Sequence, residues 1–162
     1  MIKQEYQETM CDKPYTSSDK WTVSIVSGLM FMLASSPYTF SLTNGITSKL
    51  GLVIADANGC PNLAGVLLHG IAFVFIIRML MDSKAKTHDC MKPYTSKDKW
   101  IVALIAGLLF LLFSSPFLYE TVNSLTSSFG LNIVDGKKGC PNLGGLVLNS
   151  TLYLLATRML MR

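Results

Sequence analysis

Charge is scarce in this sequence, and its scarcity excludes one class of function at once. Charged residues make up 15% of the 162 positions, whereas apolar residues make up 50%. Soluble domains usually carry about 25% charged residues. The 14 basic residues are too few, and too close to apolar runs, to form a nucleic-acid site. We therefore expect no nucleic-acid partner.

The sequence also lacks the common signatures of catalysis. It contains no glycine-rich phosphate loop, no paired carboxylates, no nucleophile elbow and no CxxC motif. His88, Asp89 and Cys90 are neighbours, but a zinc site needs four well-spaced ligands. We predict that the chain is not an enzyme and has no catalytic residue, no metal and no cofactor.

Long apolar runs are what the sequence does contain. Four runs of about 20 residues each have charge only at their edges, and they cover residues 21–40, 61–81, 100–119 and 141–161. A helix rises about 1.5 Å per residue, so each run can cross about 30 Å of hydrocarbon. Buried helices of a soluble bundle would instead show a charged stripe. The pattern predicts four transmembrane helices, with a polar start that lacks a signal peptide and a first span that acts as its own insertion signal.

The sequence contains a tandem repeat. Aligning residues 11–57 with 90–136, and 58–81 with 138–161, pairs 71 positions, of which 35 are identical. This divides the chain into a polar head (1–10), repeat 1 (11–81), a linker (82–89) and repeat 2 (90–162). The predicted fold is all-α: two parallel tandem repeats of a helical hairpin, in which each repeat contributes two spans.

Basic residues are distributed unevenly about the four predicted spans. Eleven lie on the side of the two termini, and three, Lys49, Lys137 and Lys138, lie on the other side. Positive residues favour the cytosolic face, so we expect both termini in the cytosol. Because each repeat has two spans, both repeats insert the same way up. That arrangement predicts a pseudo-twofold axis along the membrane normal.

This topology restricts how the four cysteines can pair. Cys11 and Cys90 precede the first span of each repeat, whereas Cys60 and Cys140 precede the second span on the opposite side. A bond between the two sides would have to cross the bilayer. The remaining choices are Cys60–Cys140, Cys11–Cys90 or free thiols, and the oxidising far side favours Cys60–Cys140. Without a bond, "GCPN" is simply a helix start with proline at its first position.

The phrase "KPYTSxDKW" precedes the first span of each repeat. Thr16 and Thr95 are candidate N-caps, and Asp19 and Asp98 complete a capping box. Trp21 and Trp100 then fall at the membrane interface as anchors. Membrane insertion does not need the earlier letters of the phrase, so we predict a docking surface made of Lys13, Pro14, Tyr15, Lys92, Pro93 and Tyr94.

Three further features recur at matching positions of the two repeats. "SSP" sits 15 residues into each first run and predicts a Pro-kinked extension or a short amphipathic helix on the far leaflet. Small residues four apart, at Ser24 and Gly28 and again at 103 and 107, predict a close-packing helix face. His69 matches Asn149 as an intramembrane polar residue, and we expect each to make a hydrogen bond between helices rather than a proton relay.

A resemblance adds a setting to these features. The pattern "DKW…SSPFLY…VNSLT…G.C.P", present in residues 97–141 and more loosely in 18–61, resembles small two-span membrane proteins of nucleocytoplasmic large DNA viruses, the phycodnavirus and mimivirus groups. It implies a virion internal membrane beneath an icosahedral shell, with capsid or other virion proteins as partners. Repeat 1 departs from the pattern at "SSPYTFSLTNGIT".

Two functions follow as expectations. The first is a structural multi-pass membrane protein, a virion inner-membrane or minor capsid component that tethers the bilayer to shell proteins. The alternative is a subunit of a channel or transporter, which would need a polar path lined by residues such as Ser27 and His69. Self-association into a homo-oligomer stays open in both cases.

Overall fold

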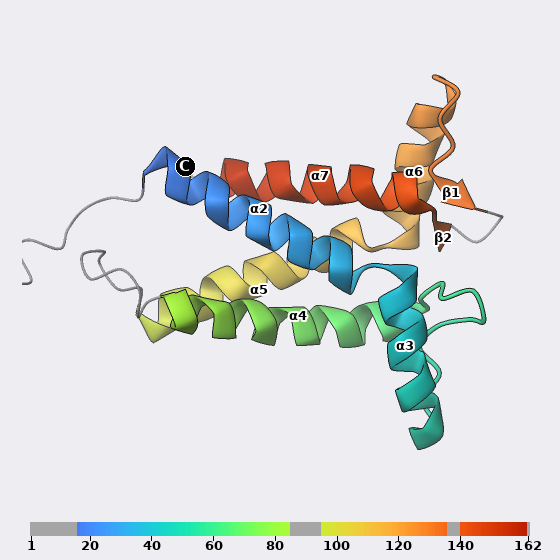
Figure 1. Cartoon of the computed structure of the whole chain (residues 1–162), viewed down its shortest axis with the longest axis horizontal. Helices are drawn as coiled ribbons and strands as arrows, with labels where there is room; N and C mark the ends of the chain where they lie inside the picture. The colour runs from blue at the N-terminus through green and yellow to red at the C-terminus, as the bar shows by residue number, and fades with distance from the viewer. Residues whose placement is uncertain (1–15, 85–94, 136–139, 162) are drawn as a thin grey trace, which may run out of the picture.

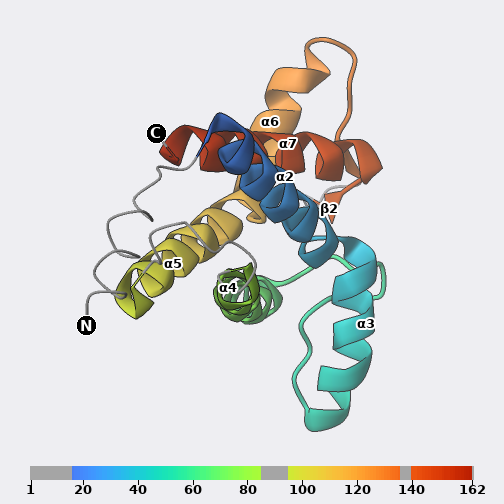
Figure 2. The same cartoon turned by 60° about the vertical axis from the view of Figure 1, so that its left-hand side comes forward.

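Four long helices form the body of the molecule. The computed structural model describes residues 16–84, 95–135 and 140–161. Within them, the long helices run side by side (Figures 1 and 2) and are α2 (Ser17–Ala34), α4 (Leu63–Lys84), α5 (Ser96–Phe113) and α7 (Leu143–Leu160). The start of α2 and the end of α7 lie at the same end of this bundle (Figure 1). The helix α4 continues three residues beyond the predicted end of repeat 1.

The first helix of each repeat begins at the predicted capping box. The Thr16 hydroxyl accepts a hydrogen bond from the backbone N–H of Asp19, and the Asp19 carboxylate accepts one from the Thr16 N–H at 3.0 Å. Thr95 and Asp98 repeat the arrangement at the start of α5. Each box satisfies two backbone donors that would otherwise lack a partner. The prediction from the sequence is therefore confirmed at both sites.

Both first helices end at "SSP" and a second helix leaves at an angle. The helix α3 (Pro37–Thr47), followed by the short helix η1 (Ser48–Leu50), is bent by 54° from α2, and α6 (Pro116–Ser127) is bent by 57° from α5. Ser36 and Ser115 cap the new helices, which begin at the prolines. The two short helices leave the bundle in opposite directions (Figures 1 and 2).

The loops that return to the second helices contain a little β-structure. Strand β1 (Val134–Asp135) pairs antiparallel with β2 (Cys140–Pro141), and repeat 1 has a single bridge, Ala55 to Pro61, at the matching positions. The all-α prediction missed this pairing because two-residue strands leave no periodic signal. Each second helix is capped by an asparagine, Asn62 or Asn142. The alternative interpretation of "GCPN", a helix with proline at its first position, is therefore wrong, because each helix begins two residues after the proline.

The repeats interlock instead of packing as separate hairpins. The closest-packed helix pairs are α4 with α5 and α2 with α7, so each first helix packs mainly on the second helix of the other repeat. Contacts between the two long helices of one repeat are sparse. The fold prediction did not specify which long helices would pack together, and the structure shows that they pack mainly across the two repeats.

Close approach in both interlocked pairs depends on the predicted small-residue face. Ser24 and Ala103 are fully buried. A methyl group added at Gly28 would lie 3.1 Å from the Leu154 side chain on α7. One added at Gly107 would lie 2.3 Å from the Val74 side chain on α4. Gly28 thus allows α2 to approach α7 closely, and Gly107 allows α5 to approach α4 closely.

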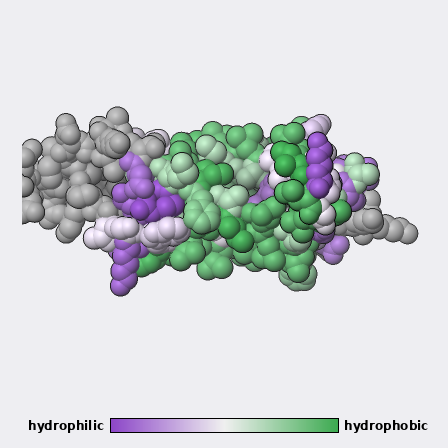
Figure 3. All heavy atoms as spheres, turned by 90° about the horizontal axis from the view of Figure 1, so that it is seen from below, coloured by the Kyte–Doolittle hydropathy of each residue, from purple (hydrophilic) through white to green (hydrophobic). Residues whose placement is uncertain are grey.

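One face of the bundle is apolar in its middle and polar toward its ends (Figure 3). Figure 3 shows a hydrophobic band over the middle of one face and hydrophilic atoms gathered toward the ends. The helices α4 and α7 are each long and apolar enough to cross a membrane, and so are the bent pairs α2 with α3 and α5 with α6 if each counts as one span. The described residues therefore contain between two and four candidate spans.

Candidate functional site

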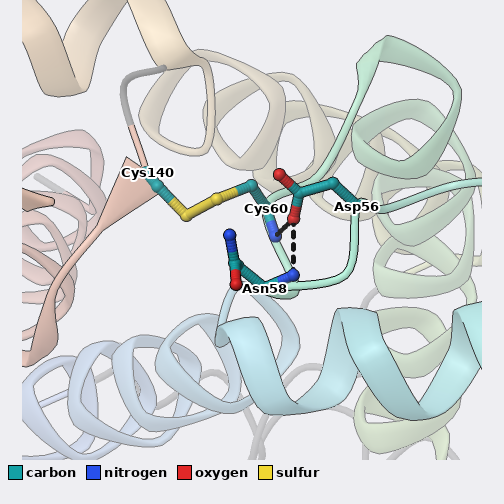
Figure 4. Close-up of a disulfide and its surroundings, with 4 residues drawn as sticks. All are labelled: Asp56, Asn58, Cys60 and Cys140. Atoms are coloured by element: carbon teal, nitrogen blue, oxygen red, sulfur yellow. Dashed lines mark hydrogen bonds between the residues drawn. A yellow bond between two sulfur atoms is a disulfide. The ribbon is translucent and has the colours of Figure 1, made fainter. Parts of the chain in front are cut away.

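The end of the bundle farthest from the start of α2 is closed by a disulfide. Cys60 and Cys140 are bonded, with their Cα atoms 5.4 Å apart. Asp56 shapes the turn before Cys60, because its carboxylate accepts hydrogen bonds from the backbone N–H groups of Asn58 at 2.9 Å and Cys60 at 3.0 Å (Figure 4). The bond joins the two repeats at equivalent positions and fixes one end of the helix bundle. Cys11 and Cys90 lie outside the described residues.

His69 and Asn149, the two predicted intramembrane polar residues, contact the backbone at the two bends. A His69 ring nitrogen lies 2.8 Å from the carbonyl oxygen of Ala34, and Asn149 donates to that of Phe113 at 3.2 Å. Both carbonyls belong to the last turn before "SSP", where the following helix turns away and leaves them without a helical partner. The predicted hydrogen bond between helices is present at each position, and it explains why a polar residue recurs there.

The middle of the bundle is filled by aromatic rings. Phe31, Phe73, Phe110 and Tyr153 are each at most 1% exposed. Phe31 stacks on Tyr153 at 4.5 Å between ring centroids, and the matching pair, Phe110 and Phe73, stacks at 4.9 Å. Edge-on contacts join the two stacks at 5.5 Å and 6.0 Å. One ring from each long helix therefore closes the space where a polar path through a single chain would have to run.

Two open hollows lie in the described surface. One of about 400 Å³ lies on α6 beside Phe117 and Leu125. Another of about 150 Å³ lies between α2 and α7. Neither reaches the aromatic centre described above. Within the described ranges 16–84, 95–135 and 140–161, no three His, Cys, Asp or Glu side chains come close enough together to hold a metal ion.

Each predicted tryptophan anchor makes a cation–π contact with an arginine. The Arg158 guanidinium lies 5.3 Å from the centre of the Trp21 ring, and that of Arg78 lies 5.7 Å from the Trp100 ring. Each pair joins one interlocked helix pair, α2 with α7 or α4 with α5. The tryptophans are 43% and 39% exposed, so the rings stand at the surface of the polar end, where an interfacial anchor belongs.

One of these two sites has its own counterion. Asp82 accepts hydrogen bonds from Arg78 and, at 2.8 Å, from Lys99. The repeat alignment matches Arg78 with Arg158 and Lys99 with Lys20. If the same offset is carried one residue past the aligned segment, Asp82 matches Arg162, so repeat 2 has no carboxylate at the equivalent position. The repeated "RMLM" signals the arginines in the sequence, but their position over the tryptophans depends on the crossed packing.

The predicted docking surface falls outside the described residues. All six positions, Lys13, Pro14, Tyr15, Lys92, Pro93 and Tyr94, precede the first residue of a described segment. The structure describes only the final part of each phrase, which caps the helix and supplies the tryptophan. No protein-family model, no curated protein and no solved structure matches the chain. Function must therefore be argued from the site itself.

Proposed function

We propose that the chain is a four-span integral membrane protein that serves as a rigid structural scaffold and is not an enzyme. Its long axis crosses the bilayer, and α3 and α6 lie along the far leaflet. The termini and the Arg–Trp pairs lie on the cytosolic face. The apolar band with polar ends supports this orientation, because a hydrocarbon solvent favours that distribution.

The observation that carries the scaffold function is the closed centre. Four buried rings occupy the middle of the bundle, and a disulfide joins the repeats at one end. A transporter needs an arrangement that opens alternately to each side, and a channel needs a wetted path. A bundle fixed at its end and packed solid at its middle suits mechanical connection better than either.

The setting follows from the resemblance noted in the sequence. In a virion internal membrane, the scaffold tethers the bilayer to capsid or other virion proteins through the repeated "KPYTSxDKW" surface. Two similar surfaces on one chain raise the effective concentration for a partner with two sites in reach. A weak contact made twice is then enough for firm attachment, with no nucleic acid and no cofactor involved.

Reconstitution in sealed vesicles tests the scaffold function against the channel alternative. We expect vesicles that contain the protein to hold a gradient of K⁺ and of a small fluorescent anion as well as empty vesicles do. Insertion is checked in the same sample by resistance to alkaline carbonate. Gradient loss that scales with protein content would reject the scaffold and favour a channel built by several chains. Release by carbonate would reject the membrane-spanning proposal itself.

A further inference from the structure

The polar end of the bundle contains two equivalent basic sites that differ in charge. In the α4–α5 site, Arg78 and Lys99 converge on Asp82, which leaves one net positive charge. In the α2–α7 site, the matching residues are Arg158 and Lys20. Position 162, one residue past the aligned segment and at the same offset from Asp82, is an arginine. The repeats therefore preserve the cations and omit the anion between them.

The cations of the α2–α7 site are not neutralised within the described part of the chain. Arg158 faces the Trp21 ring and donates to the Ser17 hydroxyl at 3.3 Å. The Nε atoms of Arg158 and Arg78 are both buried without an acceptor among the described residues, so the two sites differ in the carboxylate that Arg78 contacts through its Nη1 atom. Arg158 is half-buried, and a guanidinium that is partly shielded from water favours a charged acceptor.

A groove runs inward from this site along the same pair of helices. It has a volume of about 150 Å³ and is lined by Ile25, Gly28, Leu29, Ser150 and Leu154, among others. Ile25 is one helical turn from Trp21, and Leu154 is one turn from Arg158. The site therefore combines a cationic, aromatic rim with an apolar groove directly beneath it.

We propose that Arg158, Lys20 and Trp21 bind the headgroup phosphate of one anionic phospholipid, whose acyl chain lies in the groove between α2 and α7. The phosphate occupies the place that the Asp82 carboxylate fills in the other repeat. A guanidinium binds phosphate through paired hydrogen bonds, and basic pockets between membrane helices on the cytosolic side bind anionic headgroups. The inference rests on the proposed membrane orientation, because only that orientation places the site at headgroup depth.

Native mass spectrometry of the full chain in detergent, titrated with phosphatidylglycerol or phosphatidylcholine, tests the site. We expect one phosphatidylglycerol per chain to bind at least tenfold more tightly than phosphatidylcholine. Arg158→Gln should reduce this preference about tenfold. The matched control Arg78→Gln should leave it unchanged, because Arg78 already has a carboxylate. Asp82→Asn should create a second phosphatidylglycerol site by freeing Arg78 and Lys99.

Further measurements distinguish loss of lipid binding from misfolding, and binding of a lipid headgroup from binding of free phosphate. Arg162→Asp, which places a carboxylate at the position matching Asp82, should abolish the preference while Arg158 remains. Equal losses in Arg158→Gln and Arg78→Gln, or no loss in either, would overturn the proposal. Displacement of the lipid by inorganic phosphate at equal concentration would overturn the assignment to a lipid. An inserted, carbonate-resistant protein without lipid preference would refute this inference alone, whereas a carbonate-extracted protein would refute the proposed function as well.

Discussion

Gly145 of α7 lies where a backbone carbonyl crosses the first turn of the helix. A Cβ atom at position 145 would lie 2.2 Å from the carbonyl oxygen of Ile133. The same oxygen accepts a hydrogen bond from the Asn142 N–H at 3.1 Å. Gly145→Ala would push the loop away by roughly 1 Å to reach an ordinary contact distance, and the hydrogen bond would weaken. The matching glycine, Gly65, meets the Ile54 oxygen at the same 2.2 Å.

The expected loss of stability follows from three opposing contributions. Overpacking against a rigid neighbour costs about 1–3 kcal/mol, and a weakened hydrogen bond costs about 1 kcal/mol. Alanine is favoured over glycine in a helix by about 1 kcal/mol, which offsets part of the loss. The net destabilisation is therefore about 2 kcal/mol. For a chain of this length that lowers Tm by roughly 4–8 °C.

The assay compares Gly145→Ala with a glycine that has free space around it. Gly45, in α3, has no atom within 4 Å of an added Cβ, so Gly45→Ala should leave Tm unchanged or raise it slightly. Detergent-solubilised variants are heated in steps, and the fraction that remains monodisperse on a sizing column gives Tm. If both variants shift Tm by the same amount, the close approach of the Ile133 carbonyl to α7 is refuted.

Three further predictions concern the disulfide, the orientation and the docking surface. Replacing both Cys60 and Cys140 with serine should lower the free energy of unfolding by up to about 4 kcal/mol, because the bond closes a loop of 80 residues; unchanged denaturant midpoints with and without reductant would contradict a structural role. In sealed, reduced vesicles, an impermeant thiol reagent should label Cys60 and Cys140 from one side and Cys11 and Cys90 from the other, and labelling of Cys11 and Cys60 from the same side would exclude four spans. Alanine at Pro14, Tyr15, Pro93 and Tyr94 together should preserve insertion, since the capping boxes and tryptophans remain, but reduce recovery of shell proteins per inserted molecule; equal recovery would leave the tether without this surface.

Local signals in the sequence were sufficient to locate most helix ends. Thr16 and Asp19 begin α2 as a capping box, and Ser36 with Pro37 ends one helix and begins the next. These features involve residues at most a few positions apart, so their geometry is fixed by the backbone of one turn. Small residues at spacing four likewise predicted a packing face, because that spacing places them on one side of any helix.

The candidate sites were predictable only in part. Trp21 and Trp100 were expected as anchors because of their place at the edge of an apolar run. Their partners Arg158 and Arg78 were not, because each partner lies on a different helix whose position the sequence does not state. The sequence did not indicate that Asp82 is a counterion, because its ion pair with Lys99 joins two different helices.

The sequence by itself determined that the chain is helical, apolar in four runs, bent at two prolines and built from two similar halves. It could not decide whether α2 packs on α4 or on α7, because the spacing of residues along one helix does not specify which other helix that face contacts. Tertiary packing decided that question by placing Gly28 against Leu154 and Gly107 against Val74. The same crossed arrangement brings one aromatic ring from each long helix into a single cluster and sets Cys60 beside Cys140, because those contacts depend on distances between helices that no spacing along the chain specifies.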